Sequence, residues 1–116
     1  MMILCLGRND WKLDEIGRLL RGAGYQTFLC LDPADAVRVI EHQAIRVVVS
    51  DELLATTEGR QILEKARSLR PNIPIVYLPA TADLSPAVLE LDPDVIIKTT
   101  AWKEELCAVI AILNRR

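Results

Sequence analysis

The feature that most constrains the fold is an apolar run, Ile45 to Val49, which ends abruptly in Ser50 and Asp51. Apart from Arg46, every residue of the run is β-branched, and such side chains favour strands. A strand without a polar face indicates a central parallel strand that helices cover on both sides. In sheets of this kind, binding and chemistry gather at the carboxyl ends of the strands. Asp51 stands at that end and is therefore the first candidate site residue.

The composition indicates one ordinary folded domain. The chain has 116 residues, 51% hydrophobic and 26% charged, which is enough for a core and argues against disorder. The net charge of −2 provides no basic surface for nucleic acid or for an anionic membrane. No apolar run approaches the ~18 residues needed to cross a bilayer. Widely spaced cysteines without a disulfide framework lead us to expect a cytoplasmic protein. Cys5, Cys30 and Cys107 lie far apart among apolar residues, which indicates reduced core thiols rather than a metal site or disulfides.

Strand-like segments alternate with segments of helical periodicity along the chain. Strands are predicted at Met2 to Leu6, Tyr25 to Leu31, Ile45 to Val49, Ile73 to Leu78 and Val95 to Ile97. Helices are predicted after caps at Asn9 or Asp10 and at Asp32, and over Glu58 to Leu69, Leu84 to Leu91 and Trp102 to Leu113. Five such units predict a parallel sheet with right-handed crossovers and helices on both faces. At this length we expect an α/β, flavodoxin-like (βα)5 three-layer sandwich with strand order 2-1-3-4-5.

The residues around Asp51 resemble the receiver domain of two-component response regulators, of the chemotaxis-regulator type. In receivers a phosphoacceptor Asp ends the third strand, and an acidic residue and a glycine follow seven and eight positions later, where Glu58 and Gly59 stand here. Receivers also have a Lys at the end of the fifth strand, as Lys98 is here. The resemblance implies one receiver domain over residues 1–116, with Asp51 as phosphoacceptor and Lys98 as active-site lysine.

Several positions depart from the receiver pattern, and three of them, Gly7, Arg8 and Pro79, lie in the active site that the resemblance implies. Receivers place two adjacent acidic residues after the first strand to hold the Mg²⁺ used in phosphoryl transfer, and Gly7 and Arg8 stand there. Pro79 replaces the hydroxyl residue that ends the fourth strand, and it offers neither a hydroxyl nor a backbone donor. We therefore expect poor Mg²⁺ affinity and a degenerate site. Asp10 is the candidate for a missing metal ligand, and a helix cap is its alternative role.

A positive charge at position 8 suggests how the negative charge of Asp51 could be neutralised without a metal ion. We hypothesise that the Arg8 guanidinium pairs with Asp51, with Lys98 on the other side, which would neutralise the site without phosphate. The alternative is an Arg8 side chain that points into solvent. For Asp51 the alternatives are a true acceptor and a relic carboxylate that caps local backbone or pairs with Lys98.

The resemblance implies a signalling protein and not an enzyme. The expected function is a two-component receiver that acts through atypical or phosphorylation-independent protein–protein contacts. The implied partners are a histidine kinase or phosphotransfer protein, a fused output domain, and a second copy docked through the last strand and helix. Ile96 and Trp102 are the candidate interface residues, with a core position as the alternative for Trp102. Two other functions stay open: an orthodox Mg²⁺-dependent acceptor with Asp10 or Glu52 as ligand, and a flavodoxin-like small-molecule binding module.

Overall fold

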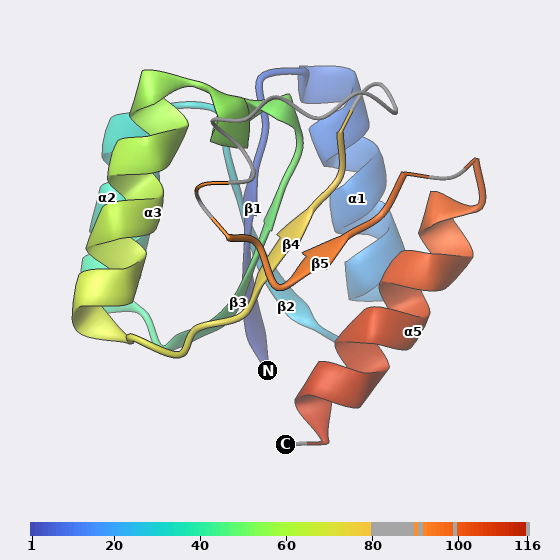
Figure 1. Ribbon diagram of the computed structural model, residues 1–116. Helices are drawn as coiled ribbons and strands as arrows, with labels where there is room; N and C mark the ends of the chain where they lie inside the picture. Colours follow the sequence, from blue (N-terminus) through green and yellow to red (C-terminus); the bar gives the residue numbers. More distant parts are fainter. Residues whose placement is uncertain (80–89, 91, 99, 116) are drawn as a thin grey trace.

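A five-stranded parallel sheet runs through the middle of the structure, with helices packed on both of its faces (Figure 1). The computed structural model describes residues 1–79, 90, 92–98 and 100–115. The strands are β1 (Met2–Leu6), β2 (Gln26–Cys30), β3 (Ile45–Ser50), β4 (Ile75–Tyr77) and β5 (Val95–Ile96). The helices are α1 (Asp10–Gly22), α2 (Pro33–His42), α3 (Thr57–Leu69) and α5 (Trp102–Asn114), and a 3-10 helix, η1 (Glu52–Ala55), follows β3. None of the described helices is both long and apolar enough to cross a membrane.

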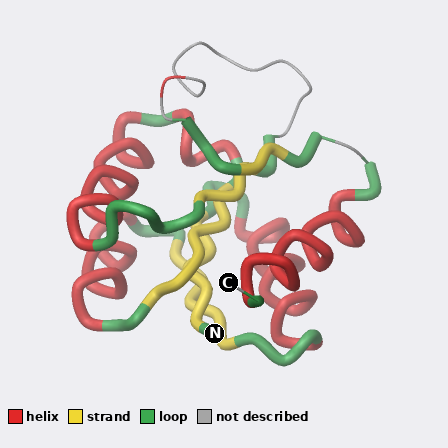
Figure 2. The backbone as a smooth tube through the Cα atoms, turned by 60° about the horizontal axis from the view of Figure 1, so that its bottom comes forward, coloured by secondary structure: helices red, strands yellow, loops and turns green. Residues whose placement is uncertain are grey.

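The strand order is β2-β1-β3-β4-β5, and every neighbouring pair is parallel. This confirms the predicted order and the flavodoxin-like fold. The strand β3 is central, and Arg46 is its only exposed residue. Helices α2 and α3 cover one face of the sheet and α1 and α5 cover the other (Figures 1 and 2). The β-branched run therefore has helices over both of its faces, as an apolar strand requires.

The fourth strand is much shorter than predicted, other strand bounds shift by one residue, and one predicted helix lies almost wholly beyond the described residues. The fourth strand was expected from Ile73 to Leu78, but β4 covers only Ile75–Tyr77. Pro74 shortens it, because proline has no N–H to donate to a neighbouring strand. Ile73 and Leu78 are nonetheless buried. The helix predicted from Leu84 to Leu91 falls outside the described residues, except for Glu90.

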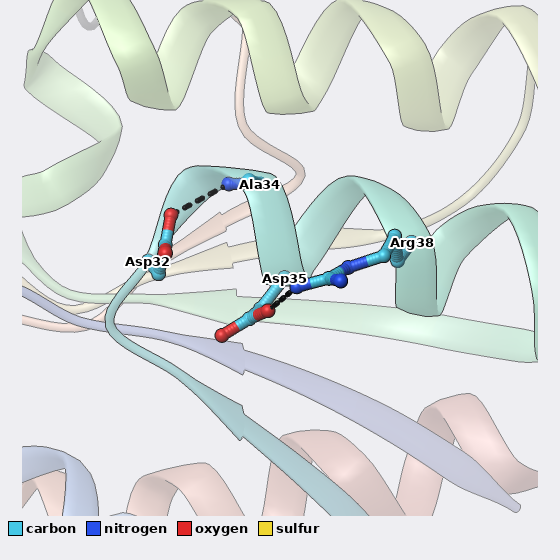
Figure 3. A network of polar contacts seen from close by, with 4 residues as sticks. All are labelled: Asp32, Ala34, Asp35 and Arg38. Atoms are coloured by element: carbon cyan, nitrogen blue, oxygen red, sulfur yellow. Dashed lines mark hydrogen bonds and ion pairs between the residues drawn. The ribbon is translucent and has the colours of Figure 1, made fainter.

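The start of α2 is set by its own side chains (Figure 3). The Asp32 carboxylate accepts a hydrogen bond from the Ala34 amide at 2.9 Å, and Pro33 occupies the first turn, where no backbone donor is needed. Asp35, also in the first turn, forms an ion pair with Arg38. Both of those side chains are more than half exposed, so the pair contributes little to stability. The Asp32–Pro33 dipeptide thus decides where this helix begins.

Each face of the sheet has its own hydrophobic core. Leu4 and Leu6 pack with the residues of α2 and α3, whereas Ile3 and Cys5 pack with those of α1 and α5. Successive strand side chains point to opposite faces, so one short strand supplies both cores. Cys5 and Cys30 are buried and free, as predicted, and Cys107 is half-buried and free. Burial raises the pKa of the Cys5 thiol from 9.0 to about 12, with a smaller contribution from Cys30.

We expect the free energy of unfolding to decrease as the pH rises above 9.0, the pKa of an unburied Cys5 thiol. Between that value and about 12 the unfolded thiol loses its proton while the folded thiol keeps it. The unfolded state then binds fewer protons than the folded state, so stability decreases with pH in this window. Denaturant titrations below and above pH 9.0 would measure the loss. The Cys5→Ala variant should lose less stability over the same range, and an equal loss would contradict the assignment to this thiol.

Candidate functional site

The Asp51 side chain lies at the carboxyl end of β3 and is only 1% exposed. Its carboxylate accepts hydrogen bonds from backbone amides of two different loops. The Leu53 amide donates to Oδ1 at 2.9 Å, which makes Asp51 the cap of η1. The Arg8 amide donates to both oxygens at 3.2 Å, and the Asn9 amide lies 3.5 Å from Oδ2. Backbone donors therefore compensate the burial of this charge.

Gly7 allows the loop between β1 and α1 to approach Asp51 this closely. A Cβ atom at this position would lie 3.1 Å from Asp51 Oδ2 and 3.2 Å from the Leu13 Cβ. The turn is anchored on both sides, since the Gly7 amide donates to the Cys30 carbonyl and the Asp51 amide donates to the Leu6 carbonyl. A larger residue would push the loop and the carboxylate apart. The glycine that breaks the receiver pattern is thus part of the geometry that brings the Arg8 amide to Asp51.

Arg8 contacts Asp51 through its backbone amide and not through its guanidinium. Among the described residues, no ion pair joins Asp51 to Arg8 or to Lys98. The predicted guanidinium pairing is therefore wrong, and the alternative of an exposed Arg8 side chain is correct. The amides that precede α1 have no acceptor within the helix and lie directly against the carboxylate, so they satisfy it first. The Arg8 side chain instead lines a cavity of about 370 Å³ together with Leu31 and Glu58.

We expect the Arg8→Gln substitution to change the free energy of unfolding by less than about 0.5 kcal/mol, because it keeps the backbone donor and removes only an exposed side chain. Chemical denaturation of the variant and the wild-type protein would measure the difference. A loss of about 2 kcal/mol would show that the guanidinium also holds the Asp51 carboxylate.

The other predicted site residues lie at the same edge of the sheet. Lys98 follows β5 and its side chain is exposed. Pro79 is half-buried and follows Leu78, whose amide donates to the Ser50 carbonyl at 2.8 Å. The topology thus brings the ends of β1, β3, β4 and β5 together, as the resemblance implies.

Asp10 lies exposed in the first turn of α1, and the cap of that helix is Asn9, whose side chain accepts from the Lys12 amide at 3.3 Å. The two cap candidates are thereby distinguished, and Asp10 is left without the capping role. In the part of the chain that the structure describes, no three His, Cys, Asp or Glu residues are grouped so that they could hold a metal ion.

Gly59, which the receiver pattern singles out, has a packing role. A Cβ atom here would lie 1.9 Å from the Leu53 carbonyl oxygen and 2.9 Å from the Leu54 Cα. The first turn of α3 therefore rests directly on the backbone of η1. Thr56 joins the two elements, because its hydroxyl donates to the Leu53 carbonyl at 2.6 Å and accepts from the Gly59 amide at 3.0 Å. This contact holds the η1 segment that Asp51 caps.

The two candidate interface residues lie on opposite faces of the sheet. Ile96 packs against the core on the α2 and α3 side, and Trp102 packs against the core on the α1 and α5 side. The Nζ atoms of Lys12 and Lys103 each lie 5.8 Å from the centre of the Trp102 ring. Both candidates are half-buried. Docking of a second copy through the last strand and helix stays a prediction.

Trp11 was not among the predicted site residues, and it is 72% exposed in the first turn of α1. The apolar stripe of this helix consists of Leu13, Ile16 and Leu20. Trp11 does not fit the helical spacing of that stripe, and this mismatch could have predicted from the sequence that its side chain is exposed. It places a large aromatic side chain on the surface close to the loop that contacts Asp51.

The curated proteins that are similar to this chain include transcriptional regulatory proteins. No family model matches the chain. The transcriptional regulatory protein YbdJ of Bacillus subtilis is 29% identical over 87 residues, which are 73% of this chain and 38% of that protein. The transcriptional regulatory protein ZraR of Salmonella typhimurium is 31% identical over 70 residues, 60% of this chain and 16% of that protein. The chain thus spans well under half of the length of these curated relatives.

Solved structures agree over nearly the whole chain. A CheY-like response regulator receiver domain from Methanospirillum hungatei has a TM-score of 0.80 and 25% identity, and the match covers 98% of this chain and 94% of the other. A structure described as a response regulator, from Chloroflexus aurantiacus, has a TM-score of 0.83 and 23% identity, with coverage of 99% and 98%.

Proposed function

We propose that this chain, which is similar in fold and sequence to the receiver domains of response regulators, signals through protein–protein contacts without phosphorylation of Asp51. The observation that carries the proposal is the hydrogen bonding of the Asp51 carboxylate. Its oxygens accept from the backbone amides of Arg8 and Leu53, and the side chain is 1% exposed. A phosphoryl donor would have to displace the β1–α1 loop before it could reach a carboxylate oxygen.

The charges around Asp51 also favour this proposal. Phosphoryl transfer to a carboxylate brings two anions together and relies on cations to offset the developing charge. Mg²⁺ would need further oxygen ligands near Asp51, and Gly7 and Arg8 provide no carboxylate at the two positions where receivers have them. The donor set does not fit Mg²⁺, so we assign no metal-dependent step to this site.

The residue after β4 argues against the usual switch as well. Pro79 has no hydroxyl and no N–H, so it cannot donate a hydrogen bond to a phosphoryl group. A phosphoryl group on Asp51 would therefore lack the link to the segment that follows β4. We propose that the domain holds one state, in which the backbone amides take the place of metal and phosphate.

The partners that we propose are proteins. The curated relatives are transcriptional regulatory proteins, and the chain spans only 38% and 16% of the two described above. An output domain or a separate protein would then bind to the surface of this domain. A histidine kinase or phosphotransfer protein could dock without transferring phosphate. We propose further that the domain catalyses no reaction of its own and works in the cytoplasm.

The test is an amide NMR titration, first with Mg²⁺ and then with beryllofluoride, which mimics an aspartyl phosphate. We expect neither addition to give saturable shifts at Asp51, Arg8 or Lys98. An orthodox receiver in the same buffer is the control for the reagents.

Saturable beryllofluoride shifts that the Asp51→Asn variant abolishes would establish the orthodox acceptor and overturn the proposal. A coloured or phosphorylated small molecule that copurifies with the protein would instead support the ligand-binding alternative.

A further inference from the structure

A cavity of about 680 Å³ opens at the edge of the sheet opposite Asp51, near the end marked N in Figure 1. It lies between the start of β3 and the segment that joins α3 to β4, and Leu113 of α5 closes one side. Seven of its ten lining residues are apolar, Ile45 and Ile73 among them. This volume and this character are typical of sites for small organic molecules.

The charged side chains that line the cavity are all positive. Arg46 and Arg70 line the cavity, and none of the lining residues is a carboxylate. Arg46 is the one exposed residue of β3, where an arginine interrupts an otherwise apolar run. No ion pair between described residues involves either arginine. The cavity therefore offers two guanidinium groups whose charge is not compensated by a described neighbour.

Arg70 has an unused donor inside the protein. Its Nη2 donates to the Gln43 carbonyl at 3.0 Å, which holds the guanidinium in place. Its Nη1 is buried and has no hydrogen-bond acceptor among the described residues. A buried donor without an acceptor is uncommon, so the protein does not satisfy the whole of this guanidinium. The cavity is the open space that this guanidinium borders.

We propose that this cavity binds a small amphiphilic anion, namely an organic carboxylate with an apolar body. The carboxylate would lie between Arg46 and Arg70, because a guanidinium matches a planar carboxylate with paired N–H donors. The apolar body would cover Ile45 and Ile73. The site lies at the other edge of the sheet from Asp51, so the proposal does not depend on the signalling function proposed above.

Decanoate tests the site, and decanol is its uncharged counterpart. In amide NMR titrations of the wild-type protein, decanoate should give saturable shifts at Ile45, Ile73 and Leu113, whereas decanol should bind at least about tenfold more weakly. The Arg46→Gln and Arg70→Gln variants should each weaken decanoate binding by about tenfold. Arg46 is exposed, so its substitution leaves the core contacts intact.

The Arg60→Gln variant is the matched control, since it removes the same charge from α3 outside the cavity lining. It should bind decanoate as the wild-type protein does. Three results would each overturn the proposal: no saturable shifts with millimolar decanoate, equal affinity for decanol, or equal weakening by Arg60→Gln and Arg46→Gln.

Discussion

Replacing Gly59 with alanine should lower the free energy of unfolding by about 3 kcal/mol or more. The added Cβ would lie 1.9 Å from the Leu53 carbonyl oxygen, far inside contact distance. The clash is with backbone, so no side chain can rotate away, and η1 or the start of α3 must move. Either movement strains the hydrogen bonds that Thr56 makes to both elements. Chemical denaturation of the wild-type protein and the variant would measure the loss.

Gly22 provides the matched control for this substitution. It is the last residue of α1, and a Cβ there would meet nothing within 4 Å. The Gly22→Ala variant should therefore be neutral or gain up to about 1 kcal/mol, because alanine is the better helix former. If both variants had the same stability, the close packing of α3 on η1 would be refuted.

The second large effect should come from Asp51. We expect the free energy of unfolding of the Asp51→Ala variant to be about 2 to 4 kcal/mol lower than that of the wild type. The reason is that the backbone amides of Arg8 and Leu53 would lose their buried acceptor. Asp51→Asn should lose less, since one amide oxygen can still accept from Leu53 at the position of Oδ1. Denaturant unfolding of the three proteins should therefore rank wild type above Asn and Asn above Ala.

The sign of this effect distinguishes two kinds of site. Where several carboxylates are clustered, removing one relieves like-charge repulsion and increases stability. Where backbone donors surround a single carboxylate, removing it decreases stability. An Asp51→Ala variant more stable than wild type would contradict the hydrogen bonding described here. The Asp14→Ala variant is the control, because Asp14 pairs with Arg18 on the surface. Its substitution should change the free energy of unfolding by less than about 0.5 kcal/mol.

Much of the architecture could be predicted because local patterns and the global fold agree. The apolar run from Ile45 to Val49 predicted a central strand, and Asp32–Pro33 predicted the start of α2. Strand ends were less predictable, since the position of Pro74 shortened β4 while Ile73 and Leu78 remained buried. The alternation of strands and helices and the chain length were sufficient for the strand order, because few arrangements bury every strand.

The site was predictable in its residues and not in its contacts. The sequence indicated Asp51, Gly7 and Arg8, and it suggested a pair between two charged side chains. The structure shows a carboxylate bound by backbone amides, and nothing in the identity of a residue tells which way its N–H points. Gly59 was recognised from a pattern, while its physical reason, the 1.9 Å approach to Leu53, needs coordinates.

The cavity at the opposite edge of the sheet could not be found from the sequence, because Met1, Arg46, Arg70 and Leu113 come from four separate parts of the chain. The sequence was enough to predict where most strands and helices lie, how the strands are ordered in the sheet, and that an aspartate ends the central strand. The positions of strands and helices depend on the hydrophobicity and backbone preferences of neighbouring residues, and the strand order follows from their alternation and the chain length. The tertiary structure alone decided what satisfies the Asp51 carboxylate and where two arginines meet an apolar cavity, because both depend on distances between residues far apart in the chain.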